Sequence, residues 1–330
     1  MKKGDTVGIV SPSWGGAGLF PDRLQHGVQC LRELGYGVRI APHALNVRGI
    51  VSDTAPDRAR DIHKMFADST VQAIISAIGG DHSCHLLPYI DFELIGRNPK
   101  IFVGSSDITV LNVAIWKKTG LTTFNGPALL PDFAEWPRMF NYTKESFLRA
   151  VGQATPIGVV APSTEFTDEY LDWGRGLDRE RARILRPNPG WTWLREGRGE
   201  GPLIGGCLES LQHLRGTPYW PKWDGAVFFF ESSGEPPETL DAILMDYENM
   251  GVWEEVSGVI AGRPYRYTDE QTRRFHDVLS ERTRKYRFPV IADMDFGHTA
   301  PQFTIPIGSR ARIDSASCGF EILEAAVREG

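Results

Sequence analysis

The stretch KIFVGSSDITVLNVAIWKKTG (residues 100–120) joins an apolar run to a segment of helical character through Gly-Ser-Ser-Asp. A short apolar run bounded by turn residues predicts a buried strand, and the segment after it predicts a helix. Ser and Asp are common helix caps. A serine at such a turn can also be a nucleophile, because amides at a helix start stabilise developing negative charge. The stretch alone favours the cap and leaves the nucleophile open.

The same handover from strand to helix repeats through the first 130 residues. Apolar runs at 6–13, 38–41 and 71–80 alternate with helical patterns at 21–35 and 55–69. Such alternation predicts a mostly parallel sheet covered by helices. In sheets of this kind, ligands bind at the carboxyl ends of the strands. We therefore predict an α/β fold with a site at that edge.

Composition divides the chain into three parts. Residues 1–135 are predicted to form an N-terminal α/β domain. Residues 136–200 are rich in Pro, Trp, Gly and charge and have weak periodicity, so we predict a linker and a long functional loop there. In residues 201–330 apolar runs and helical patterns return, which predicts a β-rich α/β C-terminal domain.

Charge and cysteine content exclude several classes of partner. The formal net charge is −6, and no Lys/Arg run suggests a basic face, so we expect neither a nucleic-acid polymer nor a membrane surface as partner. Neither a signal peptide nor an apolar run of about 18 residues is evident. The cysteines have no CxxC spacing and are expected to be reduced, packed thiols of a cytoplasmic protein; they are Cys30, Cys84, Cys207 and Cys318.

Three other segments contain residues suited to chemistry. IGGDHS (78–83) has a glycine pair that allows an exposed backbone N–H, as an oxyanion hole or phosphate cradle requires, although a tight turn explains it equally. FFFE (228–231) ends a buried run in Glu231, which either orients a histidine or is solvated at the strand tip. DMDFGHT (293–299) places His298 on a glycine-containing loop.

A metal site is a competing interpretation of the last segment. The spacing of Asp293, Asp295 and His298 permits a ligand set. The pair His82 and His85 is poorer evidence, because no further ligand is clear. A third class of function, a two-lobed module that binds a small molecule without chemistry, also remains open at this point.

Together these segments resemble the LD-carboxypeptidase family of serine peptidases over nearly the whole chain. The shared features are the glycine pair, the G-x-S-D-I-T segment, the strand ending in Glu and the Gly-His loop. LIGGCLES (203–210) resembles the family's G-G-N-L segment, with Cys207 where Asn is common. The resemblance implies a triad of nucleophile, orienting acid and base, with two backbone N–H groups as oxyanion hole. By this resemblance Ser106 is the nucleophile, Glu231 the orienting acid and His298 the base. The N–H groups of Gly80 and Asp107 would form the oxyanion hole.

The resemblance has further implications. It implies an active site between the two domains, a cytoplasmic homodimer, and neither a metal nor another cofactor. Because a serine triad needs no metal, the resemblance makes a metal site at Asp293 and Asp295 less favoured. Ser105 stands where the family usually has an aromatic residue, and nothing in the sequence explains it.

Two branches of the family offer different substrates. One releases terminal D-alanine from murein tetrapeptides, and the other, the microcin C immunity branch, cleaves aminoacyl-nucleotide toxins. IGGDH favours the second branch, since murein enzymes usually show R-G-G-Y-G there. By analogy with that branch, Trp191 or Trp193 is predicted to stack on a base, unless both pack at a domain or dimer interface. Asp81 is predicted to contact the substrate.

Overall fold

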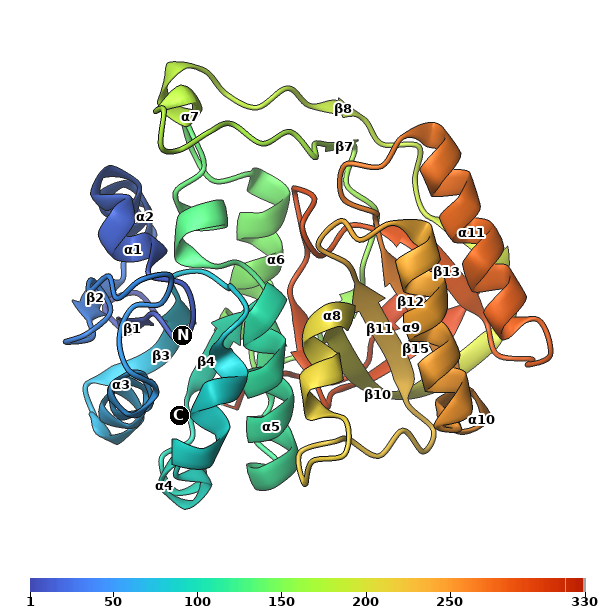
Figure 1. Ribbon diagram of the computed structural model, residues 1–330, viewed down its shortest axis with the longest axis horizontal. Helices are drawn as coiled ribbons and strands as arrows, with labels where there is room; N and C mark the ends of the chain where they lie inside the picture. Colours follow the sequence, from blue (N-terminus) through green and yellow to red (C-terminus); the bar gives the residue numbers. More distant parts are fainter. Residues whose placement is uncertain (318, 329–330) are drawn as a thin grey trace.

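The computed structural model describes residues 1–317 and 319–328 and shows two lobes, each built around a sheet (Figure 1). The predicted α/β fold class is confirmed. The described residues of the first sheet lie in the order β14-β5-β4-β3-β1-β2, parallel except for β14. Its strands are β1 (Thr6–Val10), β2 (Gly37–Ile40), β3 (Val71–Ser76), β4 (Ile101–Gly104), β5 (Thr123–Asn125) and β14 (Ile305–Ile307).

Helices cover this sheet as the apolar periodicity predicts. Helix α3 (Ala55–Ala67), for example, begins after Thr54, whose hydroxyl accepts from Asp57 N, and it buries Ile62, Met65 and Phe66. The helices of this lobe are α1 (Gly16–Leu19), α2 (Pro21–Glu33), α3 (Ala55–Ala67), η1 (Ser83–Tyr89), α4 (Phe92–Arg97), η2 (Ser106–Ile108), α5 (Thr109–Thr119), η3 (Leu129–Phe133) and α6 (Asn141–Gly152).

The second sheet has a parallel centre and antiparallel edges, which makes this lobe β-rich. Its described strands lie in the order β6-β16-β15-β10-β11-β12-β13-β9, with β10 to β13 parallel. Their bounds are β6 (Gly158–Val159), β9 (Thr192–Arg195), β10 (Arg198–Cys207), β11 (Val227–Glu231), β12 (Gly258–Gly262), β13 (Val290–Met294), β15 (Arg310–Asp314) and β16 (Gly319–Ile322). The helices of this lobe are α8 (Leu208–Leu211), η4 (Gln212–Leu214), α9 (Pro237–Asn249), α10 (Val252–Glu255) and α11 (Asp269–Thr283).

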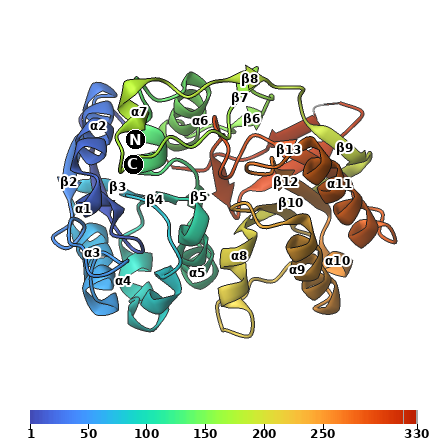
Figure 2. The ribbon, with the colours of Figure 1, turned by 45° about the horizontal axis from the view of Figure 1, so that its top comes forward.

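Residues 136–200 are more ordered than a linker and loop. Helix α6 buries Thr143, Phe147 and Ala150 at helical spacing, and β6 and β9 join the second sheet. The dense Pro and Trp on either side of α6 hide this periodicity in the sequence. The remaining part, residues 161–191, we call the strap; it runs over both lobes and contains β7 (Glu165–Phe166), α7 (Leu177–Glu180) and β8 (Arg186–Pro187) (Figures 1 and 2).

The chain also returns from the second lobe to the first, since β14 pairs with β5. No helix in the described ranges is both long and apolar enough to cross a membrane. Cys30, Cys84 and Cys207 are free thiols, and Cys318 lies outside the described residues.

Candidate active site

Ser106 occupies a sharp turn directly after β4. Its φ is +58°, a left-handed conformation that costs a non-glycine residue roughly 1–2 kcal/mol. Gly104 permits the turn, because a Cβ there would lie 2.5 Å from Ser76 Oγ and 2.7 Å from Ile108 Cγ2. Strain of this kind persists where packing over-determines it, and it is characteristic of functional sites.

His298 lies between Ser106 and Glu231. Its Nε2 is 3.1 Å from Ser106 Oγ, and its Nδ1 is 2.6 Å from Glu231 Oε2. Glu231 ends β11 and is only 2% exposed. The second sheet therefore contributes a carboxylate and an imidazole, and the first sheet contributes the hydroxyl. The three groups form a continuous chain of contacts.

Gly297 explains why a glycine precedes His298. Its φ is +103°, and a Cβ at this position would lie 2.6 Å from Glu231 Oε2 and 2.7 Å from Glu231 Cγ. On the other side of the carboxylate, a Cβ at Gly262 would lie 2.8 Å from Glu231 Cβ. Both glycines allow the main chain to enclose Glu231 closely, which limits where its carboxylate can point.

The surroundings of His298 favour its protonated form. Burial by itself lowers the pKa of the imidazole, but the negative charge of Glu231 and the hydrogen bond that His298 Nδ1–H donates to it raise the pKa by more, so the net change is upward. A carboxylate that stabilises an imidazolium in this way is what a histidine base needs after it takes a proton.

The glycine pair lies against the serine turn. A Cβ at Gly79 would lie 2.8 Å from Ser106 Cβ and 3.2 Å from Asp107 N. Gly80 has a φ of +143°, a conformation that glycine adopts readily. Within the part of the chain that the structure describes, the N–H groups of Gly80 and Asp107 donate to no backbone or side-chain acceptor. Both remain available to a ligand beside Ser106.

The Asp107 side chain fastens this loop to the turn. Its Oδ2 accepts from His82 N at 2.9 Å and from Ser83 N at 2.8 Å, and Ser83 Oγ donates to Asp107 O at 2.7 Å. Ser13 Oγ accepts from His82 N as well. The aspartate of GSSD therefore has a structural part beyond its backbone N–H, which the sequence did not reveal.

A cavity of about 330 Å³ opens onto these groups. Both lobes and the strap line it, and Ser106, His298 and Gly80 lie on its wall. This volume is at the small end of the range for small-molecule sites. Its aromatic lining consists of Trp14, Tyr170, Trp173 and Tyr265.

Ion pairs hold the strap against the first lobe at this cavity. Arg23 Nη1 lies 2.5 Å from Asp178 Oδ2, and Arg183 Nη2 lies 2.6 Å from Glu135 Oε2. Burial raises the pKa of Asp132, against the lowering effect of its hydrogen bonds. Because Arg23 and Arg183 are already neutralised, neither is a free cation for a substrate carboxylate.

Ser105 also lines the cavity, but its backbone is extended, with φ at −129°. It is Ser106, and not Ser105, whose hydroxyl lies within hydrogen-bonding distance of His298.

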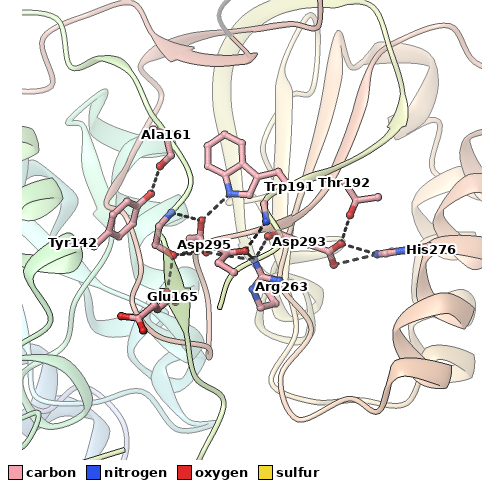
Figure 3. Close-up of polar contacts among 12 residues, drawn as sticks. Tyr142, Ala161, Glu165, Trp191, Thr192, Arg263, His276, Asp293 and Asp295 are labelled. Carbon is pink, nitrogen blue, oxygen red and sulfur yellow. Dashed lines mark hydrogen bonds and ion pairs between the residues drawn. The ribbon is translucent and has the colours of Figure 1, made fainter. Parts of the chain in front are cut away.

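The residues predicted to bind substrate are not on the cavity wall. Trp191 Nε1 donates to Asp295 Oδ2 at 2.8 Å (Figure 3). Its ring packs on Phe303. Trp193 lies in β9 opposite Ile291. Asp81 is exposed beside the glycine pair. Of the described residues around the cavity, none is Trp191, Trp193 or Asp81.

We therefore correct the choice of aromatic residues. Tyr170 and Trp173, in EYLDWG of the same segment, reach the cavity instead. The sequence signal was present, because these rings also lie in the predicted functional loop. The way in which the strap folds over the first lobe was not predictable from the local sequence pattern.

The proposed metal ligands face separate partners. Asp293 accepts from Thr192 Oγ1 and contacts His276 (Figure 3). His298 instead faces Glu231. Asp295 belongs to the network described next. Among the described residues, no group of three or more His, Cys, Asp or Glu side chains could hold an ion. Asp293, Asp295 and His298 therefore do not form a common metal site in this structure.

Asp295 instead anchors both ends of the strap. Its carboxylate accepts from Ser163 N at 3.1 Å, Asn188 Nδ2 at 2.8 Å and the Trp191 indole (Figure 3). Arg263 Nη2 lies 3.5 Å from Asp295 Oδ1 and balances its charge. The network lies three residues before His298, so it holds the strap and the histidine loop together.

Comparison with known proteins agrees with this geometry. The LD-carboxypeptidase N-terminal domain matches residues 7–126, and the LD-carboxypeptidase C-terminal domain matches residues 200–313. The chain belongs to the LD-carboxypeptidase family. The resemblance recognised from the sequence is thereby confirmed. As a member, the protein is a serine carboxypeptidase or amide hydrolase.

Relatives in the family differ in what they act on. The microcin C7 self-immunity protein MccF of Escherichia coli is 31% identical, over 97% of this chain and 94% of its own. A Bacillus subtilis protein named "Probable murein peptide carboxypeptidase" is also 31% identical, over 100% of this chain and 95% of its own. A solved structure of MccF with aspartyl sulfamoyl adenosine has a TM-score of 0.92 at 30% identity, covering 99% of this chain and 98% of the other.

Proposed function

We propose that this LD-carboxypeptidase family member is a Ser-Glu-His amide hydrolase of aminoacyl-nucleotide substrates. The observation that carries the proposal is the chain of contacts from Ser106 Oγ through His298 to Glu231, beside two backbone N–H groups without acceptors. Nucleophile, base and orienting acid within hydrogen-bonding reach are the signature of covalent catalysis by serine.

The mechanism follows from this arrangement. Ser106 Oγ attacks the substrate carbonyl carbon while His298 Nε2 takes the hydroxyl proton, and Glu231 stabilises the imidazolium. The N–H groups of Gly80 and Asp107 donate to the oxyanion. Collapse of the tetrahedral intermediate breaks the C–N bond, and His298 gives its proton to the leaving nitrogen. A water molecule then hydrolyses the acyl-serine with His298 again as base.

The choice of substrate is supported by the cavity and by the likeness to MccF. The wall of the cavity that contains Ser106 also includes Trp173, and Arg23 lies over the indole ring with Cζ 4.1 Å from the centroid. Aromatic rings of this kind bind bases by stacking. The alternative is release of D-alanine from a murein tetrapeptide, which the equally similar Bacillus subtilis relative favours.

One assay separates the two substrates. Purified protein is incubated with aspartyl sulfamoyl adenosine and, separately, with a murein tetrapeptide, and products are identified by mass spectrometry. We expect release of sulfamoyl adenosine. Turnover of the tetrapeptide alone would contradict the first proposal and support the second. Turnover of neither substrate would favour the hypothesis of a two-lobed module that binds a small molecule without chemistry.

Trp173→Leu is expected to raise KM for aspartyl sulfamoyl adenosine about 10-fold, because a base loses a stacking surface worth on the order of 1–3 kcal/mol. The matched control is Trp193→Leu, another half-buried indole that lies away from the cavity. We expect it to leave KM within about twofold, since it removes no stacking surface from the site. A larger change in the control would restore the assignment made from the sequence.

The value of kcat/KM is also expected to fall at acidic pH. Protonated His298 cannot accept the Ser106 proton, so kcat/KM should decrease as pH falls through the pKa of this histidine. Because the Glu231 charge raises that pKa, the midpoint should lie above the usual histidine value and should move down in Glu231→Gln. The measurement is the pH profile of kcat/KM; a flat profile across the histidine range would contradict the role of His298.

Two expectations from the family resemblance remain predictions. A homodimer would be seen by light scattering of the purified protein at several concentrations. A cytoplasmic location would be seen by fractionation of the cells that make it.

A further inference from the structure

The proposed triad is divided between the two lobes, and this raises the question of what holds its parts in register. Ser106 follows β4 of the first sheet, whereas Glu231 ends β11 of the second sheet and His298 follows β13. A relative shift of the lobes would change the distance from Ser106 Oγ to His298 Nε2 directly. The inference below rests on the proposed function of these three residues.

Thr109 makes a buried polar contact across this boundary. It is the first residue of α5, three residues after Ser106, and its side chain is fully buried. Its Oγ1 accepts a hydrogen bond from Cys207 N at 2.9 Å, and Cys207 ends β10 of the second sheet. Figures 1 and 2 show α5 of the first lobe beside α8, which begins where β10 ends.

The hydroxyl is not used in the way that threonine at a helix start is usually used. The cap position of α5 is Ile108, and no side chain caps its N-terminus. A threonine at the cap position itself would accept from an amide of its own helix, but Thr109 is one residue further along. Here Thr109 Oγ1 accepts from the Cys207 N–H of the other lobe.

Gly206 brings the two backbones into direct contact at the same point. Its φ is +145°, and a Cβ there would lie 2.4 Å from both Cγ2 and Oγ1 of Thr109. The glycine therefore lets Thr109 rest on the main chain of β10. Any side chain at position 206 would push α5 away from this strand.

The route from Thr109 to the orienting acid is short. Cys207 lies opposite Glu231 in the parallel register of β10 and β11. Glu231 then contacts His298 Nδ1. The path between the two halves of the triad thus consists of one turn of chain, one buried hydrogen bond and one step across a sheet. Buried packing of this density transmits small shifts rather than absorbing them.

We propose that Thr109 is a positioning residue, whose hydroxyl sets the register between the Ser106 turn and the strands that carry Glu231 and His298. Thr109 does not line the cavity, so its effect is on the geometry of the reacting groups and not on substrate contact. A misplacement of reacting groups by about 1 Å can lower a rate about 10²-fold.

The test compares T109V with T109S. Valine keeps the shape of threonine but leaves the Cys207 N–H buried without an acceptor, and serine keeps the acceptor but loses the methyl group. We expect T109V to lower kcat about 10-fold to 100-fold with KM within about twofold, and T109S to stay within about threefold of the native rate. T109A also lacks the hydroxyl and carries the test should T109V not fold.

A second readout is the rate at which a fluorophosphonate labels Ser106. This probe reports the serine–histidine pair without the natural substrate, so it remains valid even if the proposed substrate is wrong. We expect the labelling rate to fall in T109V and T109A and to recover in T109S, at a temperature where circular dichroism shows all variants folded. Native labelling in the folded hydroxyl-free variants, or equal loss in T109S, would overturn the proposal.

Discussion

Ser106→Ala is expected to lower kcat by about 10⁴- to 10⁶-fold while the protein remains folded, since removal of a serine nucleophile typically costs this much. The variant keeps the cavity and the backbone N–H groups, so the substrate should still bind. The loss follows because Oγ, the atom 3.1 Å from His298 Nε2, is absent. The measurement is release of sulfamoyl adenosine under single-turnover conditions.

Ser105→Ala is the matched control for this prediction. Ser105 is the preceding residue, lines the same cavity and also carries a hydroxyl, but Ser106 is the serine that contacts His298. We expect its rate to stay within about threefold of the native protein, since it removes no group that acts on the reacting atoms. Substantial turnover by Ser106→Ala, or a comparable loss in Ser105→Ala, would show that the nucleophile is wrongly assigned.

Glu231→Gln is expected to lower kcat by about 10⁴-fold, as loss of the orienting acid does in serine triads. The carboxylate accepts from the Nδ1 side of His298 at 2.6 Å, which leaves Nε2 free to take the serine proton. A glutamine amide can donate to Nδ1 instead, and the imidazole then carries its proton on Nε2, facing Ser106. In that tautomer the base cannot accept a proton. Turnover of aspartyl sulfamoyl adenosine measures the effect.

Glu209→Gln serves as the control for the loss of a nearby negative charge. Glu209 Oε1 accepts from Ser232 Oγ and Ser233 N just beyond Glu231, and it does not contact His298. Because it orients no catalytic group, its replacement should change kcat by less than about 10-fold. Similar losses in the two variants would mean that charge alone, rather than orientation of His298, explains the effect of Glu231.

Local patterns were reliable where one period dominates. The apolar runs that became β3, β4 and β11 are continuous because these strands are buried on nearly all positions of both faces, and the stripe that became α3 buries one face of a helix. Helix α6 was missed, because its four buried residues lie within a segment whose Pro and Trp content suggests a loop.

The candidate site was predictable to the extent that each member follows a strand. Ser106, Glu231 and His298 stand at strand ends, where α/β proteins place ligands, and the family resemblance linked them in one order. The rings predicted to stack on a base, Trp191 and Trp193, do not line the cavity, whereas Tyr170 and Trp173 do. The strap folds back over the first lobe through Arg23–Asp178 and Arg183–Glu135, and pairs separated by so many residues leave no local pattern.

The sequence by itself therefore determined the fold class, the order of its elements and the residues that could react, because periodicity and turn chemistry act over a few neighbouring positions. Only the tertiary structure decided which side chains meet. Ser106 and His298 are 192 positions apart along the chain, and Thr109 and Cys207 are 98 apart. Contacts at such separations arise from how two whole sheets pack, so their geometry emerges only when both lobes are folded together.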